Sequence, residues 1–327
     1  MENQQNNATE SKDGHSETPG WERGVLEKLA MAAVTEQRRA RRWGVFFKML
    51  MFIYLLGIGA MAVYPKFEKS MSASDEEHTA VIDVVGVIAE SEAANAQSII
   101  DGLRKAFKDK KTKGVILNIN SPGGSPVQSA YVFAEIRRLK EKYPDIPIHA
   151  VVSDICASGG YYIAAAADNI YVSQSSMIGS IGVIMNGFGF VNTMEKLGID
   201  RRLITAGKHK ALMDPFSAVN SEENQHMQSL VNNVHQQFIA AIRQGRGDRL
   251  TETEDLFSGL VWTGEQGVKL GLADGFGSVD SVARDVLGAE KRINFTPQER
   301  LLDKLVGKLG ASFGHALGSA VSGFSMH

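Results

Sequence analysis

Apolar and polar positions divide the chain into one long apolar run near its start and a series of shorter runs after it. Residues 44–64 read G-V-F-F-K-M-L-M-F-I-Y-L-L-G-I-G-A-M-A-V-Y, with Lys48 as the one charged residue. A helix of about 21 residues, at 1.5 Å per residue, is long enough for roughly 30 Å of hydrocarbon. Trp43 and Tyr64 stand at its two ends, as aromatic residues do at membrane interfaces. The pattern predicts a transmembrane anchor over residues 44–64.

The residues around this run predict how the anchor is oriented. A helical pattern over residues 21–42 ends in four arginines: Arg38, Arg39, Arg41 and Arg42. We expect a basic juxtamembrane helix there, with its N-terminus in the cytoplasm and everything after Tyr64 on the far side. About forty residues precede the apolar core, which favours an uncleaved anchor over a signal peptide. The polar residues 1–20 predict a disordered cytoplasmic tail, and residues 65–78 predict a linker.

Beyond the linker, short apolar runs alternate with helical patterns. Buried strands are expected over residues 79–89 (one bent strand or a pair), 114–120 and 146–152, and helices over 95–108, 127–143 and 161–167. Strands that alternate with helices indicate an α/β fold with a mostly parallel sheet. A long helical stretch follows at residues 221–243. We predict a folded domain over residues 79–290 and a C-terminal extension over residues 291–327.

Composition narrows the choice of chemistry. The net charge is −2, and the folded part has no basic patch with interleaved aromatic residues, so we expect no nucleic-acid partner. Cys156 is the single cysteine, which rules out an internal disulfide. The eight histidines show no H-E-x-x-H or other metal-ligand spacing. We expect neither a metal nor a cofactor.

A serine in the stretch A-S-G-G-Y-Y, residues 157–162, is a candidate nucleophile. Ser158 follows the strand expected over residues 146–152 and precedes the helix expected over 161–167. An N-cap or a packing role is the ordinary explanation for such a serine. The small residues around it let a substrate backbone approach, and a helix N-terminus favours the negative charge of acyl transfer. The pattern is not G-x-S-x-G, so it predicts no α/β-hydrolase elbow.

A glycine pair follows another strand of the same sheet, and a second serine lies within a further expected strand. Gly123 and Gly124 come after the strand expected over residues 114–120. They form either a plain tight turn or a set of exposed backbone N–H groups at a strand end, where α/β proteins bind ligands. The turn lacks G-K-[ST], so it is no phosphate loop. Ser180 lies between Gly179 and Ile181 in a pattern typical of a strand.

A nucleophilic serine needs a base, and residues 205–216 hold three candidates: Lys208, His209 and Lys210. A Ser-His pair needs an acidic residue to orient the histidine, and no spacing identifies one. A Ser-Lys pair needs no acid, but it needs an ammonium group that is buried among apolar groups and loses its proton near neutral pH. Lys210 precedes the apolar residues 211–213.

Together these motifs resemble the signal peptide peptidase A family of serine proteases, which use a Ser-Lys dyad on a Clp/crotonase-like fold. The matching pieces are N-S-P-G-G-S at 120–125, A-S-G-G-Y-Y at 157–162, G-S-I-G-V at 179–183, G-K-H-K at 207–210, and W-T-G-E-Q-G with G-L-A-D between 262 and 274. They occur in the family order over about residues 79–286, as one unit, like the short forms of the family. The long cytoplasmic tail and the glycine-rich C-terminus depart from the pattern.

The resemblance implies a role for each matched residue. Ser158 corresponds to the nucleophile, Lys210 to the general base, and Ser180 to the serine that hydrogen-bonds the lysine. The backbone N–H groups of Gly124 and Gly159 correspond to the oxyanion hole, with Gly123 as the alternative to Gly124.

The expected function is that of a single-pass serine endopeptidase of the bacterial inner membrane, with its catalytic domain in the periplasm. Its expected partners are peptide substrates such as signal-peptide remnants, the lipid bilayer, and further copies of the chain in a ring-like homo-oligomer. The alternatives are a crotonase-like acyl-CoA enzyme and an inactive membrane scaffold. A membrane anchor is unusual for the first, and the second requires that the dyad is not assembled.

Overall fold

The structure is a computed structural model that describes residues 21–71 and 76–297. The chain divides into two units, residues 1–73 and 74–327, and each is described by itself. The expectations for the tail at residues 1–20 and for the glycine-rich segment after residue 297 lie outside the described residues.

The first unit contains one helix, α1, over Trp21–Met71. By length and composition, its stretch Gly24–Gly59 contains a segment that could cross a membrane, with a mean hydropathy of 1.4 over 18 residues. The basic segment and the apolar span, which the sequence presents as separate segments, lie on this one helix. The helix also continues through residues 65–71, where the sequence predicts a linker.

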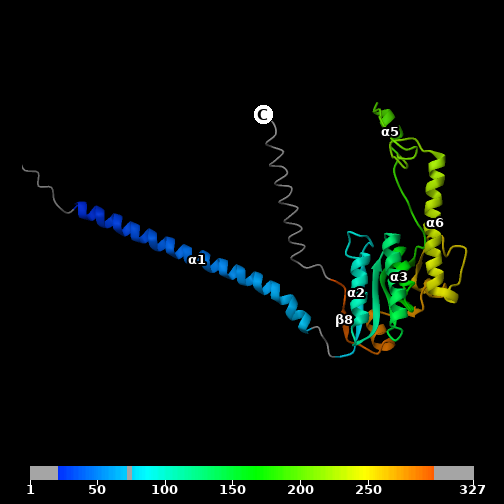
Figure 1. The fold of residues 1–327 in the computed structure, drawn as a ribbon, viewed down its shortest axis with the longest axis horizontal. Helices are drawn as coiled ribbons and strands as arrows, with labels where there is room; N and C mark the ends of the chain where they lie inside the picture. The colour runs from blue at the N-terminus through cyan, green and yellow to red at the C-terminus, as the bar shows by residue number, and fades with distance from the viewer. Residues whose placement is uncertain (1–20, 72–75, 298–327) are drawn as a thin grey trace, which may run out of the picture. The chain divides into compact units, whose positions relative to one another are not determined.

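The second unit is built around one mostly parallel sheet in the order β6-β5-β3-β2-β1-β8, with β4 pairing to β3 and β7 pairing to β4 (Figure 1). Every pairing is parallel except that of β5 with β6. The strands are β1 His78–Val85, β2 Thr112–Ser121, β3 Ile148–Ala157, β4 Asn169–Val172, β5 Met177–Gly179, β6 Val261–Thr263, β7 Gly275–Phe276 and β8 Arg292–Asn294. The predicted α/β class is confirmed.

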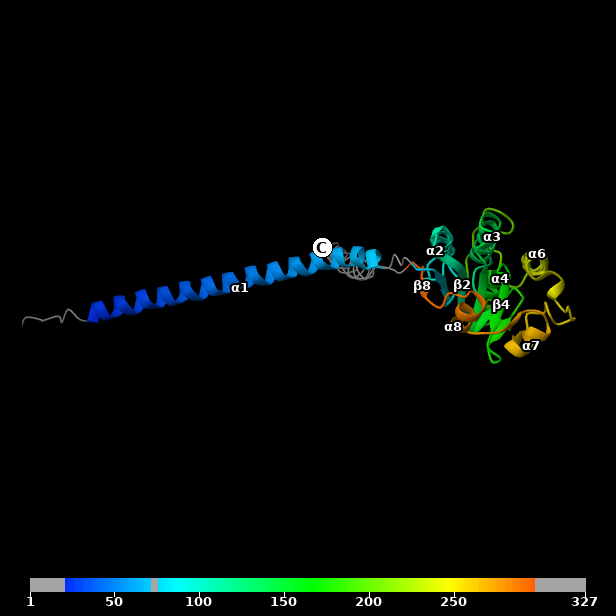
Figure 2. The same ribbon diagram turned by 90° about the horizontal axis from the view of Figure 1, so that it is seen from below.

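Helices lie on both faces of the sheet. They are α2 Ala96–Lys108, α3 Pro126–Lys142, α4 Gly159–Ala164, α5 Val191–Lys196, α6 Ser221–Arg246, α7 Gly264–Lys269 and α8 Val279–Ser281, with short turns η1 Gly247–Arg249 and η2 Val282–Val286. Figure 2 shows the sheet between α2 and α3 on one side and α8 on the other. The larger core joins α2, α3 and α4 to one face, and a smaller cluster joins η2 to Ile116 and Val151 on the other face.

Local sequence explains where the principal helices begin. The side chain of Asn95 accepts a hydrogen bond from the Ser98 N–H at the start of α2. Ser125 caps α3 in the same way and is followed by Pro126, whose fixed φ suits the first helical position. The periodic residues Ile99, Leu103 and Phe107 of α2 are buried, as their spacing predicts.

The strand β8 extends the domain beyond its predicted end. Residues 292–294 pair in parallel with Thr79–Val81 of β1. The Thr79 side chain also donates a hydrogen bond of 2.6 Å to the Ala289 carbonyl. Residues up to Asn294 therefore belong to the sheet, although the sequence places them in a C-terminal extension.

One part of the second unit stands away from the core, and we call residues 184–237 the arm. It comprises α5, the loop after it, and the first two thirds of α6. No residue of the arm is buried, whereas Phe238, Ile239 and Ile242 farther along α6 are buried. Figure 1 shows α6 running away from the sheet, with α5 beside its far end.

Candidate active site

Ser158 lies at the carboxyl end of β3 with a strained backbone. Its φ is 52° and its ψ is −122°, a conformation that residues other than glycine rarely adopt. Its side chain makes no capping hydrogen bond to α4, so the ordinary N-cap explanation does not apply. The Ser158 N–H donates to the Gly179 carbonyl at 2.8 Å, and the residue is partly exposed. Strain of this kind is often found at functional sites.

Ser180 occupies the matching place on the neighbouring strand. Ala157 of β3 pairs with Gly179 of β5, so each serine is the first residue after a paired strand end. Ser180 also has a positive φ, 50°, and its N–H donates to the Leu260 carbonyl at 2.7 Å. The sequence placed Ser180 within a strand, whereas it follows one.

The glycine turn lies directly against Ser158. A Cβ atom on Gly123 would lie 2.7 Å from both the Gly159 nitrogen and the Ser158 Cβ. A Cβ atom on Gly124 would lie 2.2 Å from the Ile88 carbonyl oxygen, and the φ angles of the two glycines are 100° and 150°. The turn therefore needs glycine at both positions, because of both the close approach and the positive φ.

The N–H groups of the turn differ in their partners. The Gly123 N–H donates to the Ser121 Oγ at 3.1 Å. Neither the Gly124 N–H nor the Gly159 N–H has a hydrogen-bond acceptor among the described residues. A Cβ atom on Gly159 would lie 3.2 Å from the Gly124 nitrogen, so the two free N–H groups are close neighbours beside Ser158.

Lys210 lies on the arm, beside the first turn of α6. The Lys208 ammonium contacts a Glu222 carboxylate oxygen at 3.1 Å, and the His209 Nδ1 lies 3.1 Å from the Glu223 Oε1. Lys210 itself is exposed. Farther along α6, the His235 Nε2 lies 3.1 Å from the Ile181 carbonyl oxygen, just past the end of β5.

The length of α6 separates this lysine from the serines. The twelve residues from Glu223 to His235 correspond to about 18 Å of helix at 1.5 Å per residue. Ser158 and Ser180 lie near the His235 end, whereas Lys210 lies near the other end. A nucleophile and its base must come within about 3 Å of each other. The structure brings Ser158, Ser180, Gly124 and Gly159 together within one chain and does not bring Lys210 to them.

Other reactive groups contribute little to this site. No group of three or more His, Cys, Asp or Glu side chains that could hold a metal ion occurs within residues 21–71 or 76–297. The Cys156 thiol lies two residues before Ser158 and is fully buried, which raises its pKa and keeps it protonated.

Three residues near the site were not singled out from the sequence. Ser129 on α3 is fully buried under Gly159, whose added Cβ would lie 2.5 Å from the Ser129 Oγ. Arg246 has a fully buried side chain that pairs with Asp274. Two sequence features could have indicated this pair. Arg246 lies in a basic segment that is otherwise typical of a turn, and Asp274 ends the motif G-L-A-D.

Comparison with known proteins identifies the family of the chain. Residues 140–292 match the model of peptidase family S49. The chain is 34% identical over 220 residues to a putative signal peptide peptidase SppA of Enterococcus faecium, covering 65% of this chain and 63% of that protein. It is 30% identical over 205 residues to a putative protease of Synechocystis, covering 63% and 72%.

A third similar protein is named as an antiporter rather than as a protease. The chain is 39% identical over 213 residues to a Na⁺/H⁺ antiporter NhaA of Brucella abortus, covering 65% of this chain and 29% of that protein. This chain therefore spans less than a third of the antiporter and 63% of the Enterococcus protein.

The mostly parallel sheet is ClpP/crotonase-like, and its carboxyl edge carries the strained Ser158 and the free N–H groups. The chain belongs to peptidase family S49, the family of the signal peptide peptidase A proteins. The resemblance drawn from the sequence motifs is confirmed.

Proposed function

We propose that the protein is a membrane-anchored serine endopeptidase that uses Ser158 and Lys210 to cut signal-peptide remnants or other membrane-associated peptides. The observation that carries this proposal is the strained Ser158 beside the free N–H groups of Gly124 and Gly159. Two backbone donors next to a nucleophile are what a tetrahedral oxyanion requires. The similarity to the Enterococcus protein supports the substrate class.

In this mechanism the Ser158 Oγ attacks a peptide carbonyl while Lys210 removes its proton. The oxyanion accepts hydrogen bonds from the Gly124 and Gly159 N–H groups. Gly124 is the better candidate than Gly123, because the Gly123 N–H already donates to Ser121. Lys210 then protonates the leaving amine, and a water molecule activated by the same lysine hydrolyses the acyl-enzyme. Ser180 accepts a hydrogen bond from Lys210 and orients it.

Lys210 must reach a Ser158, and we infer that it reaches the one on a neighbouring copy of the chain. The arm that carries Lys210 exposes large apolar side chains at several positions: Ile184 84%, Phe188 82%, Ile204 97% and Val219 80%. A single soluble chain rarely leaves so many apolar side chains together in water. Docking of the arm on a second copy would cover them, desolvate the lysine, and produce the expected homo-oligomer.

Mixing variants tests this arrangement. Ser158→Ala and Lys210→Ala chains should each be inactive alone, and co-assembled chains should regain a substantial fraction of activity. Mixtures of either variant with a Ser158→Ala/Lys210→Ala double variant should stay inactive and serve as the control. Inactive mixed assemblies would show instead that the arm folds back onto its own chain.

A panel of substitutions tests the dyad itself. Ser158→Ala and Lys210→Ala should each abolish nearly all turnover of a short apolar peptide, and the double variant should lose little more, because the two groups act as one unit. Ser180→Ala should have a smaller effect. Lys208→Ala and His209→Ala are the matched controls, since both are exposed on the same loop. An active Lys210→Ala together with an inactive His209→Ala would replace the Ser-Lys mechanism with a Ser-His one.

We also propose that α1 anchors the domain in the bacterial inner membrane, with the N-terminus in the cytoplasm and the catalytic domain in the periplasm. The proposal rests on the apolar run of α1 that begins at residue 44 and on the four arginines before that run, Arg38, Arg39, Arg41 and Arg42. Protease added to intact spheroplasts should digest the second unit and spare residues 1–40. Digestion of the N-terminal residues with a protected second unit would reverse the topology.

A further inference from the structure

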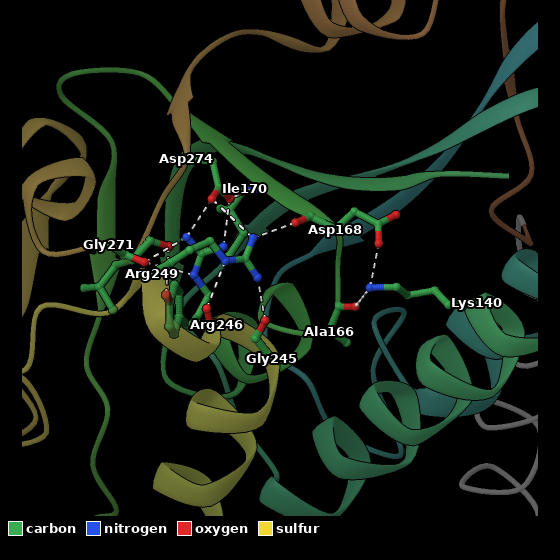
Figure 3. A network of polar contacts seen from close by, with 11 residues as sticks. Lys140, Ala166, Asp168, Ile170, Gly245, Arg246, Arg249, Gly271 and Asp274 are labelled. Carbon is green, nitrogen blue, oxygen red and sulfur yellow. Dashed lines mark hydrogen bonds and ion pairs between the residues drawn. The ribbon is translucent and has the colours of Figure 1, made fainter. Parts of the chain in front are cut away.

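A buried polar junction holds the C-terminal end of α6, the helix that carries the arm (Figure 3). The Arg246 side chain is fully buried at the end of α6 and makes two contacts with the Asp274 carboxylate, at 2.7 Å and 3.0 Å. Its Nε and Nη2 also donate to the Gly271 carbonyl at 2.9 Å and 2.8 Å. These contacts fix the guanidinium plane against the loop of residues 271–274.

The same loop is bound to the helix that follows the nucleophile. The Tyr161 hydroxyl donates to the Leu272 carbonyl at 2.8 Å, and Tyr161 is fully buried on α4, three residues after Ser158. Asp274 exchanges hydrogen bonds with Ile170 of β4, through its N–H to the carbonyl at 2.8 Å and through its carboxylate to the N–H at 2.7 Å. The loop therefore connects α6 on one side with α4 and β4 on the other.

Further contacts strengthen the base of α6. The Arg249 side chain donates to the Asp168 carbonyl at 2.7 Å and to the Gly245 carbonyl at 2.6 Å, and contacts Asp274 at 3.3 Å. A Cβ atom on Gly245 would lie 1.9 Å from the Ala165 carbonyl oxygen, so the backbones of α6 and of the segment after α4 touch. The C-terminal end of α6 is therefore firmly attached to the part of the domain that begins with Ser158.

Because α6 is long, its tilt at the C-terminal end strongly affects where its N-terminal end lies. From Arg246 to the first residue of α6 the helix is about 38 Å long at 1.5 Å per residue. By simple geometry, a tilt of roughly 5° at the base moves the far end by about 3 Å. A displacement of about 1 Å between reacting groups can cost roughly 100-fold in rate.

We propose that Arg246 and Asp274 are positioning residues, which fix the axis of α6 relative to the helix of Ser158 and thereby set where the arm presents Lys210. This inference rests on the Ser-Lys mechanism proposed above. A buried ion pair contributes little net stability compared with apolar side chains of similar size, so orientation is the better account of a guanidinium kept in a core. The four directed hydrogen bonds of Arg246 provide that orientation.

The chain supplies a matched control for Asp274. Glu135 on α3 is also a little-exposed carboxylate held by two arginines, Arg104 at 2.8 Å and Arg138. It lies outside the junction. Asp274→Asn should lower kcat at least about tenfold and leave KM within about twofold. Glu135→Gln should leave both constants within about twofold, at a temperature where circular dichroism shows both variants to be folded.

Distance measurements test the same inference without an activity assay. Nitroxide labels on Gln225→Cys in the arm and Ala134→Cys on α3 report the position of α6 relative to the core, and both sites are exposed. The labelled full-length chain is diluted in unlabelled chain, so that only distances within one chain are measured by electron paramagnetic resonance. Asp274→Asn should broaden the distance distribution by several ångströms, and Glu135→Gln should not.

Each outcome decides the inference. A folded Asp274→Asn variant with the wild-type distance distribution would overturn the positioning role, whatever its activity. A broad distribution with unchanged kcat would show that the angle of α6 does not matter for the reaction, and would also overturn it. If the wild-type protein cleaves no peptide, the proposed function fails, while the distance measurement still decides whether the junction fixes α6.

Discussion

The substitution Gly159→Ala should separate the two N–H groups that face the proposed oxyanion. The new Cβ would lie 2.5 Å from the Ser129 Oγ, about 0.9 Å closer than the 3.4 Å of ordinary contact. Ser129 cannot move aside easily, because it is fully buried and its hydroxyl donates to the Ser125 carbonyl at 3.0 Å. The backbone at residue 159 must therefore shift by several tenths of an ångström.

A backbone shift of several tenths of an ångström is large compared with the precision that the N–H donors of an oxyanion hole require. Loss of one donor typically lowers kcat by about 10²–10³, because the donors must lie within a few tenths of an ångström of their position. We expect Gly159→Ala to lower kcat about 100-fold on a short apolar peptide ester, with the fold retained by circular dichroism.

A second substitution separates the clash from a general defect. In Gly159→Ala/Ser129→Ala the 2.5 Å contact is removed, and the next nearest atoms to the new Cβ are the Gly124 nitrogen at 3.2 Å and the Gly123 Cα at 3.6 Å. The double variant should regain at least about tenfold in kcat over Gly159→Ala, and Ser129→Ala alone should remain near wild type. Full activity of Gly159→Ala, or no recovery in the double variant, would refute the reasoning.

Three further predictions follow from the contacts of single residues. The Arg138 and Arg104 guanidinium groups lower the pKa of Glu135 to about 2, so its stabilisation is present above pH 4.5 and is lost as the pH falls toward 2. Because the arginines are half exposed, Glu135→Gln should reduce the free energy of unfolding in urea by about 1–2 kcal/mol at pH 7, and a gap that stays constant down to pH 2.5 would contradict this. Gly179→Ala places a Cβ 2.9 Å from the Trp262 Cδ1 at a φ of +101°, so it should lower both the melting temperature and the activity. An unchanged melting temperature and activity would show that the end of β5 adjusts to the new methyl group without cost. Iodoacetamide should leave the folded protein active and unlabelled at pH 8, because Cys156 is fully buried; rapid labelling would show that the core beside Ser158 opens.

The sequence predicts most of the sheet because burial leaves a clear pattern in it. The central strands β1, β2 and β3 are rich in apolar and β-branched residues, and the helices after β1 and β2 begin at the capping residues Asn95 and Ser125. The edge strand β8 is only R-I-N, and it pairs with a segment more than 200 residues away. A strand of three residues at the edge of a sheet has too little buried surface to show in the sequence.

The candidate site, like the fold, could be predicted from the sequence only in part. Ser158, Gly124 and Gly159 could be proposed from the sequence because small residues cluster in two short segments that follow neighbouring strands. The choice between Gly123 and Gly124 could not be made, since it depends on a hydrogen bond from Gly123 to Ser121. The place of Lys210 could not be predicted either, because it depends on how far α6 extends from the core.

The structure gives the two halves of the proposed dyad different physical settings. Ser158 lies on a strained backbone held by the Gly179 carbonyl and flanked by a fully buried core, so its position is fixed within the chain. Lys210 lies on an exposed arm that joins the core through the segment after Ser180 and through the lower part of α6. In this position Lys210 cannot take the proton of Ser158, because α6 holds it away from the serine. If the arm must dock before Lys210 can act, peptidase activity is linked to assembly, and an isolated chain with an intact Ser158 is inactive toward any peptide it meets before assembly.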